Sequence, residues 1–341
     1  MADTDNTSAA SETTNQQQPA RKRFQKKQLS AEYLQEDYEQ NMLGVTAGFF
    51  CAIWAAWVMG EHFSSMFTTF DYPDLDNDGH YYFGGKDVAL VVFVASKILF
   101  VRAALFRYVL RPTLRCLGVQ SFERRQRLAE LVFASLVYSV SALSGAYFVG
   151  QMPQISSIGL EYLWSSACSS VGISTEFKVF VLGQCAMRLA ELVAEFIEGE
   201  DKPGYYRRIA IHYLFIGTLS CAGLLGREKF AGLVVLAVDF PAVAVAEAAL
   251  LSDTLLASIK PALGFVAGSV AAASTLVVLP GLAYASAWCE TPANVSFGSG
   301  YGWTLVGSMA ALCALQAIQA AKLWRDSPPP VLSQDMAKKT L

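Results

Sequence analysis

The sequence predicts an all-α polytopic membrane protein with about eight transmembrane helices, on three observations. The chain has 341 residues, of which 53% are hydrophobic and only 16% charged, whereas soluble proteins carry about 25% charged residues. Its mean hydropathy is +0.35. Residues 41–325 contain several weakly charged stretches of about 18–25 residues, the length that crosses a bilayer as a helix. The strands of an outer-membrane barrel are about 10 residues long and alternate in polarity, so the pattern argues against a barrel and against a soluble domain.

Residues 1–40 form a polar tail that differs from the rest of the chain. Residues 1–28 are rich in Ser, Thr, Asn and Gln and end in the basic cluster Arg21–Lys27. Such a composition cannot bury enough apolar surface to fold, so we expect disorder there and an interfacial helix over residues 29–40. The first apolar stretch begins only after residue 40, which argues against a signal peptide. A basic flank is usual beside a first span, so this cluster does not indicate nucleic-acid binding.

Hydropathy then predicts eight spans, at about 41–60, 88–108, 129–149, 178–197, 209–225, 230–251, 262–287 and 303–323. The fourth is the weakest, because Arg188, Glu191 and Glu195 interrupt it. If it does not cross the membrane, the protein has seven spans and its termini lie on opposite sides. The fifth and sixth spans are joined by a short turn at 226–229, which predicts a tight antiparallel pair.

The distribution of Lys and Arg predicts the orientation. With the N-terminus in the cytosol, most basic residues outside the spans fall in cytosolic segments: the N-terminal tail, 109–128, 198–208 and the C-terminal tail 324–341. The lumenal segments hold three basic residues, Lys86, Arg227 and Lys229. Positive charge is concentrated on the cytosolic side of membrane proteins. We therefore expect both termini in the cytosol.

Two short motifs agree with this topology. The chain ends in Lys338-Lys339-Thr340-Leu341, which resembles the dilysine retrieval signal of endoplasmic-reticulum membrane proteins and requires a cytosolic C-terminus. A glycosylation sequon at Asn294 falls in a loop predicted to be lumenal. A second sequon at Asn6 lies in the cytosolic tail, so a sequon alone has little weight. We expect a multi-pass protein of the endoplasmic-reticulum membrane.

Neither a metal nor a bound cofactor is expected. The seven cysteines include no C-x-x-C pair. Cys168 and Cys289 lie in predicted loops and can pair only if both loops face an oxidising lumen. Asp74–Gly79 matches the first half of an EF-hand loop, but the twelfth position is Gly85 where a bidentate Glu is needed. An acidic lumenal turn is the better interpretation.

Ionisable residues inside predicted spans are costly and suggest function. The fourth span places Arg188, Glu191 and Glu195 on one helical face. The others are Lys97 and Arg102 in the second span, His212 in the fifth, and Asp239 and Glu247 in the sixth. These residues could be a buried structural network in which Arg188 neutralises Glu191 or Glu195, with Lys97 extending toward the interface. Alternatively His212 and Asp239, on adjacent helices, form a functional site.

The chain carries Gly84-Gly85-Lys86-Asp87 before an apolar span, followed by Arg111-Pro112. This arrangement resembles the start of the domain of the ceramide synthases, the longevity-assurance branch of the TLC-domain proteins. The basic linker and span at 123–138 resemble its next segment. The strongest match is 202–251, with a basic aromatic start, Ile-His, two closely joined spans, an acidic position and Glu-Ala. The resemblance covers about 62–255, with a TLC-like core at about 88–251 inside a transmembrane domain at 41–323.

The resemblance implies transfer of a fatty acyl group from acyl-CoA, as co-substrate, to the amine of a long-chain base. In that chemistry His212 would be the nucleophile or general base and Asp239 its orienting carboxylate. Tyr213 would donate a hydrogen bond to the developing oxyanion. Arg188 or Lys97 would attract the phosphates of CoA or a headgroup.

The same comparison shows where this chain departs from the family. Ceramide synthases carry a His-His pair where this chain has His212-Tyr213, and two Asp three residues apart in the following span. An ungapped alignment on Gly232 and Glu247 places Asp239 one position short of the first Asp and leaves the second without a counterpart. Glu247, from the matched Glu-Ala, is a third candidate lipid-binding residue. Tyr205 stands where the family usually has an acidic residue.

Three functional hypotheses follow. The first is a catalytically weakened or inactive ceramide-synthase-like protein that binds a long-chain base or acyl chain, or regulates an active partner in sphingolipid metabolism. The second is a working N-acyltransferase that uses His212 and Asp239. The third is a structural subunit of a membrane complex, as a homo- or hetero-oligomer. Whether His212 and Asp239 face each other in a lipid-lined cavity open to the cytosol separates the first two hypotheses. A large, flat, apolar surface without such a cavity would favour the third. A secondary transporter is less favoured, because no internal repeat is evident.

Overall fold

The computed structural model describes most of the predicted membrane domain. The described residues are 9–60, 65–69, 72–73, 80–150, 173–198, 204–224, 226, 228–254, 260–274, 307–318 and 321. The predicted acidic turn at Asp74–Gly79, Cys168, Cys289, both sequons and the terminal lysines lie outside them.

The described residues are almost entirely helical, as the sequence predicts. The long helices are α1 (Ala9–Val58), α3 (Asp87–Leu105), α5 (Phe122–Gly150), α7 (Thr175–Glu198), α8 (Tyr205–Leu224), α9 (Glu228–Thr254) and α10 (Lys260–Ala273). A π-helical turn (Phe106–Leu110) continues α3 into the short α4 (Arg111–Cys116). One pair of two-residue strands, β1 (His80–Tyr81) and β2 (Ile173–Ser174), is antiparallel, with His80 opposite Ser174. A further apolar helix covers Gly307–Ile318.

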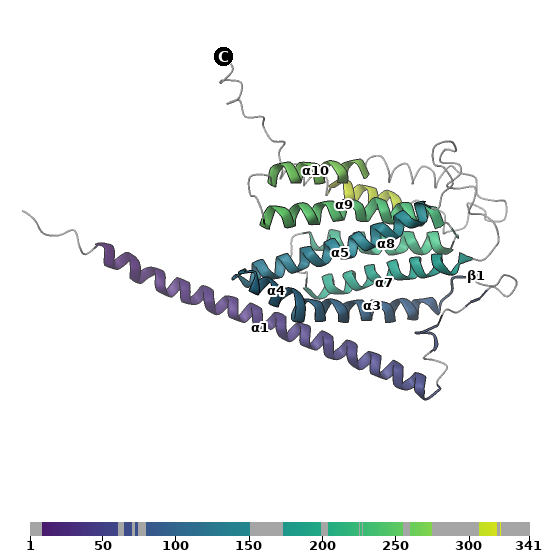
Figure 1. Ribbon diagram of the computed structural model, residues 1–341, viewed down its shortest axis with the longest axis horizontal. Helices are drawn as coiled ribbons and strands as arrows, with labels where there is room; N and C mark the ends of the chain where they lie inside the picture. Colours follow the sequence, from purple (N-terminus) through teal and green to yellow (C-terminus); the bar gives the residue numbers. More distant parts are fainter. Residues whose placement is uncertain are drawn as a thin grey trace, which may run out of the picture. The chain divides into compact units, whose positions relative to one another are not determined.

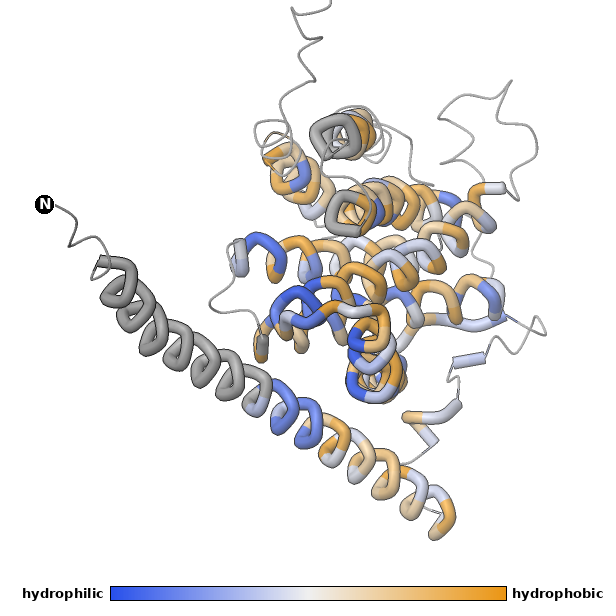
Figure 2. The backbone as a smooth tube through the Cα atoms, turned by 60° about the vertical axis from the view of Figure 1, so that its left-hand side comes forward, coloured by the Kyte–Doolittle hydropathy of each residue, from blue (hydrophilic) through white to orange (hydrophobic). Residues whose placement is uncertain are grey.

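Four of these helices are long and apolar enough to cross a membrane: Gln35–Val58, Asp87–Cys116, Phe122–Gly150 and Glu228–Leu251. They match the first, second, third and sixth predicted spans and indicate a membrane-embedded protein. Figure 2 shows the change from hydrophilic to hydrophobic along the later part of α1. The expected count of eight spans is therefore reached only in part.

The other four predicted spans are not among these four helices, for two separate reasons. Helices α7 and α8 occupy the fourth and fifth positions, but Arg188, Glu191 and Glu195 interrupt α7, and Arg207 and Arg208 lower the hydropathy of α8. The seventh and eighth predicted spans are described only over α10 and Gly307–Ile318.

The N-terminal tail also differs from the prediction. Helix α1 begins at Ala9, so residues 9–28, which we expected to be disordered, are helical. This stretch is rich in Ala, Gln, Lys and Arg, which favour helix. Extending an existing helix is also easier than nucleating a new one.

The chain divides into two compact units. One comprises residues 1–49 and 100–129, and the other comprises residues 50–99 and 130–341. In the first unit, Arg111 of α4 forms a buried ion pair with Glu39 of α1. Arg111 also donates to Gln126 Oε1 of α5 at 3.1 Å, and Arg107 donates to the carbonyl of Glu36 at 3.2 Å. These contacts tie α1, α4 and the start of α5 together.

The second unit is a bundle in which α7 packs along α8, and α9 packs against α8 and α10 (Figure 1). Its apolar core is built from buried side chains of α5, α7, α8, α9 and the helix at 307–318. Phe177, Phe215 and Leu219 are fully buried there. The ring of Phe148 of α5 lies 4.5 Å, centroid to centroid, from that of Phe180 of α7, with the two rings tilted by 40°.

Helices α5 and α9 approach each other closely at a pair of glycines. A Cβ added at Gly145 would lie 2.8 Å from the carbonyl oxygen of Gly232, and one added at Gly232 would lie 3.0 Å from the carbonyl oxygen of Gly145. Small residues allow such close backbone approach in membrane bundles.

We expect Gly145→Ala to destabilise the bundle by about 1–3 kcal/mol, because the methyl group would push two backbones apart. Gly217 of α8 is the matched control, since a Cβ there meets nothing within 4 Å; Gly217→Ala should be neutral or stabilising by up to about 1 kcal/mol. Thermal unfolding in detergent compares the two variants. Equal unfolding temperatures for Gly145→Ala and Gly217→Ala would contradict the close approach of α5 and α9 at Gly145 and Gly232.

Candidate functional site

Polar side chains from four helices meet inside the second unit. We call the following six residues the polar cluster: Tyr138 and Ser141 of α5, Arg188 and Glu191 of α7, His212 of α8, and Asp239 of α9. Asp239 is completely buried, and Arg188 and Ser141 are nearly so. Such polar groups are found in the interior of a helix bundle only when they form hydrogen bonds or ion pairs with one another.

Arg188 is the centre of the polar cluster. Its Nη2 donates to Asp239 Oδ1, and its Nη1 donates to Glu191 Oε2 at 2.8 Å. The guanidinium carbon lies 4.9 Å from the ring centre of Tyr138 and 4.5 Å from that of Phe215. Two carboxylates and two aromatic faces thus stabilise one buried cation.

Asp239 is fully engaged by residues other than the histidine. Its Oδ1 accepts from Arg188, and its Oδ2 accepts from the hydroxyl of Ser141. Ser141 Oγ also lies 2.7 Å from Gln184 Oε1. Both oxygens of Asp239 are therefore used to hold α5, α7 and α9 together.

The carboxylate beside His212 is Glu191. His212 Nδ1 lies 3.3 Å from Glu191 Oε2, which is an ion-pair distance, although the atoms are not aligned for a hydrogen bond. The expectation that Asp239 orients His212 is therefore wrong. Both carboxylate oxygens of Asp239 accept hydrogen bonds from other residues, Arg188 and Ser141. The alternative expectation, that Arg188 neutralises Glu191, is confirmed, and Glu195 pairs instead with Arg208 at 2.9 Å.

A polar cavity of about 240 Å³ adjoins the polar cluster. Its polar lining comprises Tyr138, Arg188, Arg208, His212, Asp239 and Gln316, and the remaining lining is aliphatic. His212 and Asp239 thus share one cavity, as the functional interpretation requires. They come from α8 and α9, the pair that the sequence predicted to be tightly joined.

Helix α9 contains a proline next to this cavity. Pro241 has no N–H to bond to the carbonyl of Ala237. The hydroxyl of Ser274, at the end of α10, donates to that carbonyl instead. A side chain from a neighbouring helix thus satisfies the freed backbone group, as membrane bundles commonly require.

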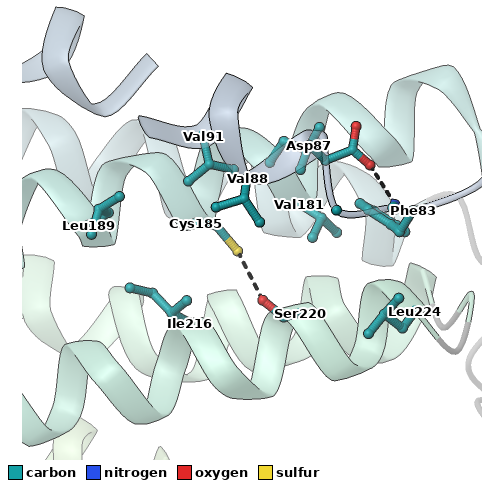
Figure 3. Close-up of a pocket in the computed structure, with 13 residues that line it drawn as sticks. Phe83, Asp87, Val88, Val91, Val181, Cys185, Leu189, Ile216, Ser220 and Leu224 are labelled. Carbon is teal, nitrogen blue, oxygen red and sulfur yellow. Dashed lines mark hydrogen bonds between the residues drawn. The ribbon is translucent and has the colours of Figure 1, made fainter. Parts of the chain in front are cut away.

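A larger, apolar cavity of about 440 Å³ lies between α3, α7 and α8. In Figure 3, Val88 and Val91 of α3 lie across from Ile216, Ser220 and Leu224 of α8, and Cys185 of α7 lies between them. Its few polar groups include Ser220, whose Oγ lies 3.8 Å from Cys185 Sγ, and Asp87 at one end. We call this the apolar cavity.

A buried lysine supports one end of the apolar cavity. Lys178 of α7 is 0% exposed; its Nζ lies 3.0 Å from Asp87 Oδ1 and donates to the carbonyl of Tyr82 at 2.9 Å. The rings of Tyr72, Tyr81 and Phe83 lie 5.4–5.9 Å from the ammonium nitrogen. Asp87 Oδ2 in turn accepts from the backbone N–H of Gly84 at 2.9 Å. Lys178 thereby fixes the segment that lines the cavity.

Three candidates from the sequence lie away from both cavities. Tyr213 is 70% exposed on α8 and is not among the lining residues, whereas Tyr138 lines the polar cavity. Lys97 lies over the ring of Phe93, 4.2 Å from its centre. Glu247 is exposed and accepts a 3.4 Å hydrogen bond from Ser135. Only His212, Asp239 and Arg188 of the predicted site residues come together.

The residues that sequence reasoning missed are Tyr138, Ser141 and Lys178. Tyr138 and Ser141 lie in an otherwise apolar span, where a hydroxyl gives little signal. Lys178 stands at the predicted boundary of the fourth span, where a basic residue is usual and gives little signal. Its burial depends on Asp87, 91 positions earlier in the chain, which sequence spacing does not reveal.

No protein-family model matches the chain, and a search of curated proteins found no matching sequence. Among the described residues, no group of three or more His, Cys, Asp or Glu side chains is arranged to hold a metal ion.

Proposed function

We propose that this protein binds a lipid and holds one hydrocarbon chain in the apolar cavity. The observation that carries the proposal is the lining: aliphatic side chains of three helices surround about 440 Å³, with few polar groups. Small-molecule sites are typically about 300–1,000 Å³, mostly apolar, and have a few polar groups that set orientation. A hydrocarbon chain matches this chemistry better than a polar metabolite does.

The resemblance to ceramide synthases supplies the lipid class: a long-chain base or an acyl chain of sphingolipid metabolism. Catalysis is expected to be weak or absent. Both oxygens of Asp239 are engaged by Arg188 and Ser141, and Tyr213 is exposed outside the polar cavity. We further propose the endoplasmic-reticulum membrane, with both termini in the cytosol, from the charge distribution and the dilysine ending. Regulation of a membrane-bound partner would be the physiological role.

The test is to fill the apolar cavity. Val91→Trp places an indole inside it and should abolish most binding of a photoactivatable long-chain lipid to the purified protein. Val92→Trp is the matched control, because Val92 is 42% exposed and does not line the cavity. Equal labelling of both variants and the wild type, with unfolding temperatures that show intact folds, would overturn the proposal.

A second candidate function is favoured by one contact. His212 lies 3.3 Å from Glu191 and lines the polar cavity, and a carboxylate beside an imidazole can set the orientation of the ring. An N-acyltransferase would then use His212 as general base, a role worth about 10²–10⁴-fold in rate. In the same preparations, acyl-CoA and a long-chain base should give no turnover if the lipid-binding proposal is right. Turnover that His212→Ala abolishes would establish the enzyme instead.

A further inference from the structure

A cluster of arginines surrounds the turn between α4 and α5 in the first unit. Residues 107–127 contain six arginines and one acidic residue, Glu123. Three of the six have exposed side chains: Arg115 at the end of α4, and Arg124 and Arg127 in the first turns of α5. We call these three the arginine surface.

The other three arginines build the turn that carries this surface. Arg125 is buried and donates to the carbonyls of Val119 and Gln120, at 3.3 and 2.9 Å. Arg111 is buried against Glu39, and Arg107 donates to the carbonyl of Glu36. Gly118 adopts φ +85°, which permits the reversal between the helices. The arginine surface therefore stands on a turn held by hydrogen bonds.

The turn joins two helices that are long and apolar enough to cross a membrane, Asp87–Cys116 and Phe122–Gly150. A connection between two such spans lies at a membrane surface. Tyr108 and Leu117 are 66% and 73% exposed beside the arginines. Tyrosine is enriched at the level of the lipid headgroups. Exposed apolar and cationic side chains are thus brought together at the depth where headgroups lie.

We propose that the arginine surface binds the phosphate groups of anionic phospholipids in the adjoining leaflet. Guanidinium groups match phosphate oxygens bidentately, and the surrounding charge of residues 107–127 is strongly positive. None of the three arginines lines either cavity, and the proposal does not depend on the proposed lipid-binding function. Its ligand is a bilayer lipid and not a substrate.

The experiment measures binding of fluorescent phosphatidylserine, with phosphatidylcholine as the neutral counterpart, to the full chain in mixed micelles. The triple variant Arg115→Gln/Arg124→Gln/Arg127→Gln should bind phosphatidylserine about fivefold more weakly per arginine removed, while binding of phosphatidylcholine is unchanged. Raising the salt concentration should weaken phosphatidylserine binding to the wild type, because exposed charges are screened.

The single variants Arg124→Gln and Lys86→Gln give the matched comparison. Lys86 is exposed just before the first residue of α3, at the opposite end of the span from the arginine surface, so its loss should leave phosphatidylserine binding unchanged. Unchanged binding in the triple variant, or an equal loss in Lys86→Gln, would overturn the proposal. Competition by millimolar inorganic phosphate would also overturn it, since that result indicates a small-anion site.

Discussion

Replacing Arg188 by methionine is expected to lower the free energy of unfolding by about 3–5 kcal/mol. The variant keeps most of the side-chain volume but leaves Asp239 completely buried without its cation, and leaves Glu191 with no arginine partner. Removing one member of a buried ion pair is costly because the remaining charge has no compensation. Chemical or thermal unfolding in detergent measures the loss.

A second variant separates charge from packing. Arg188→Met/Asp239→Leu removes both charges, and a well-packed apolar replacement of a buried pair is often neutral or stabilising. The double variant should therefore recover most of the stability lost in Arg188→Met. If the double variant is as unstable as the single one, the loss comes from the other contacts of Arg188, with Glu191, Tyr138 and Phe215, and the ion pair with Asp239 is not the cause.

Lys178→Met should have an effect of the same size, about 3–5 kcal/mol. The substitution leaves Asp87 buried without a cation and deprives the carbonyl of Tyr82 of its donor. Because Asp87 lines the apolar cavity, we also expect weaker binding of the photoactivatable lipid at temperatures where the protein remains folded.

Lys86→Met is the control for that experiment, since it removes a neighbouring but exposed lysine. Surface charges contribute about 0–1 kcal/mol, so this variant should unfold like the wild type and bind lipid normally. If Lys178→Met is as stable as the wild type, the segment at residues 80–87 holds its position without the buried ammonium group.

The sequence predicts the helical class and four spans well, because long apolar stretches report directly on burial in a bilayer. It also indicates His212, Asp239 and Arg188, since charged groups in apolar helices are conspicuous. The alternative of a buried network around Arg188 describes the contacts of Glu191 correctly. These successes depend on local composition or on helical spacing within one segment.

The sequence does not determine which side chains of neighbouring helices contact one another. His212 could face a carboxylate on either neighbouring helix, and the choice of Glu191 over Asp239 depends on how α7 and α8 are rotated against each other. Tyr213 follows His212 directly, so it points to a different side of α8, about 100° away. The exposure of Tyr213 follows from that rotation, which hydropathy alone does not define.

The shared contacts of Arg188 have a consequence for how the chain enters the membrane during synthesis. A charged residue at the centre of a helix costs about 2.5–3.5 kcal/mol for insertion, and α7 carries Arg188, Glu191 and Glu195. The counter-ion Asp239 is made 51 residues after Arg188. If α7 crosses the membrane, as the sequence predicts for residues 178–197, it would be retained near the insertion machinery until α9 emerges, and the two helices would enter the lipid phase together. A nascent chain that ends before α9 should fail to integrate α7.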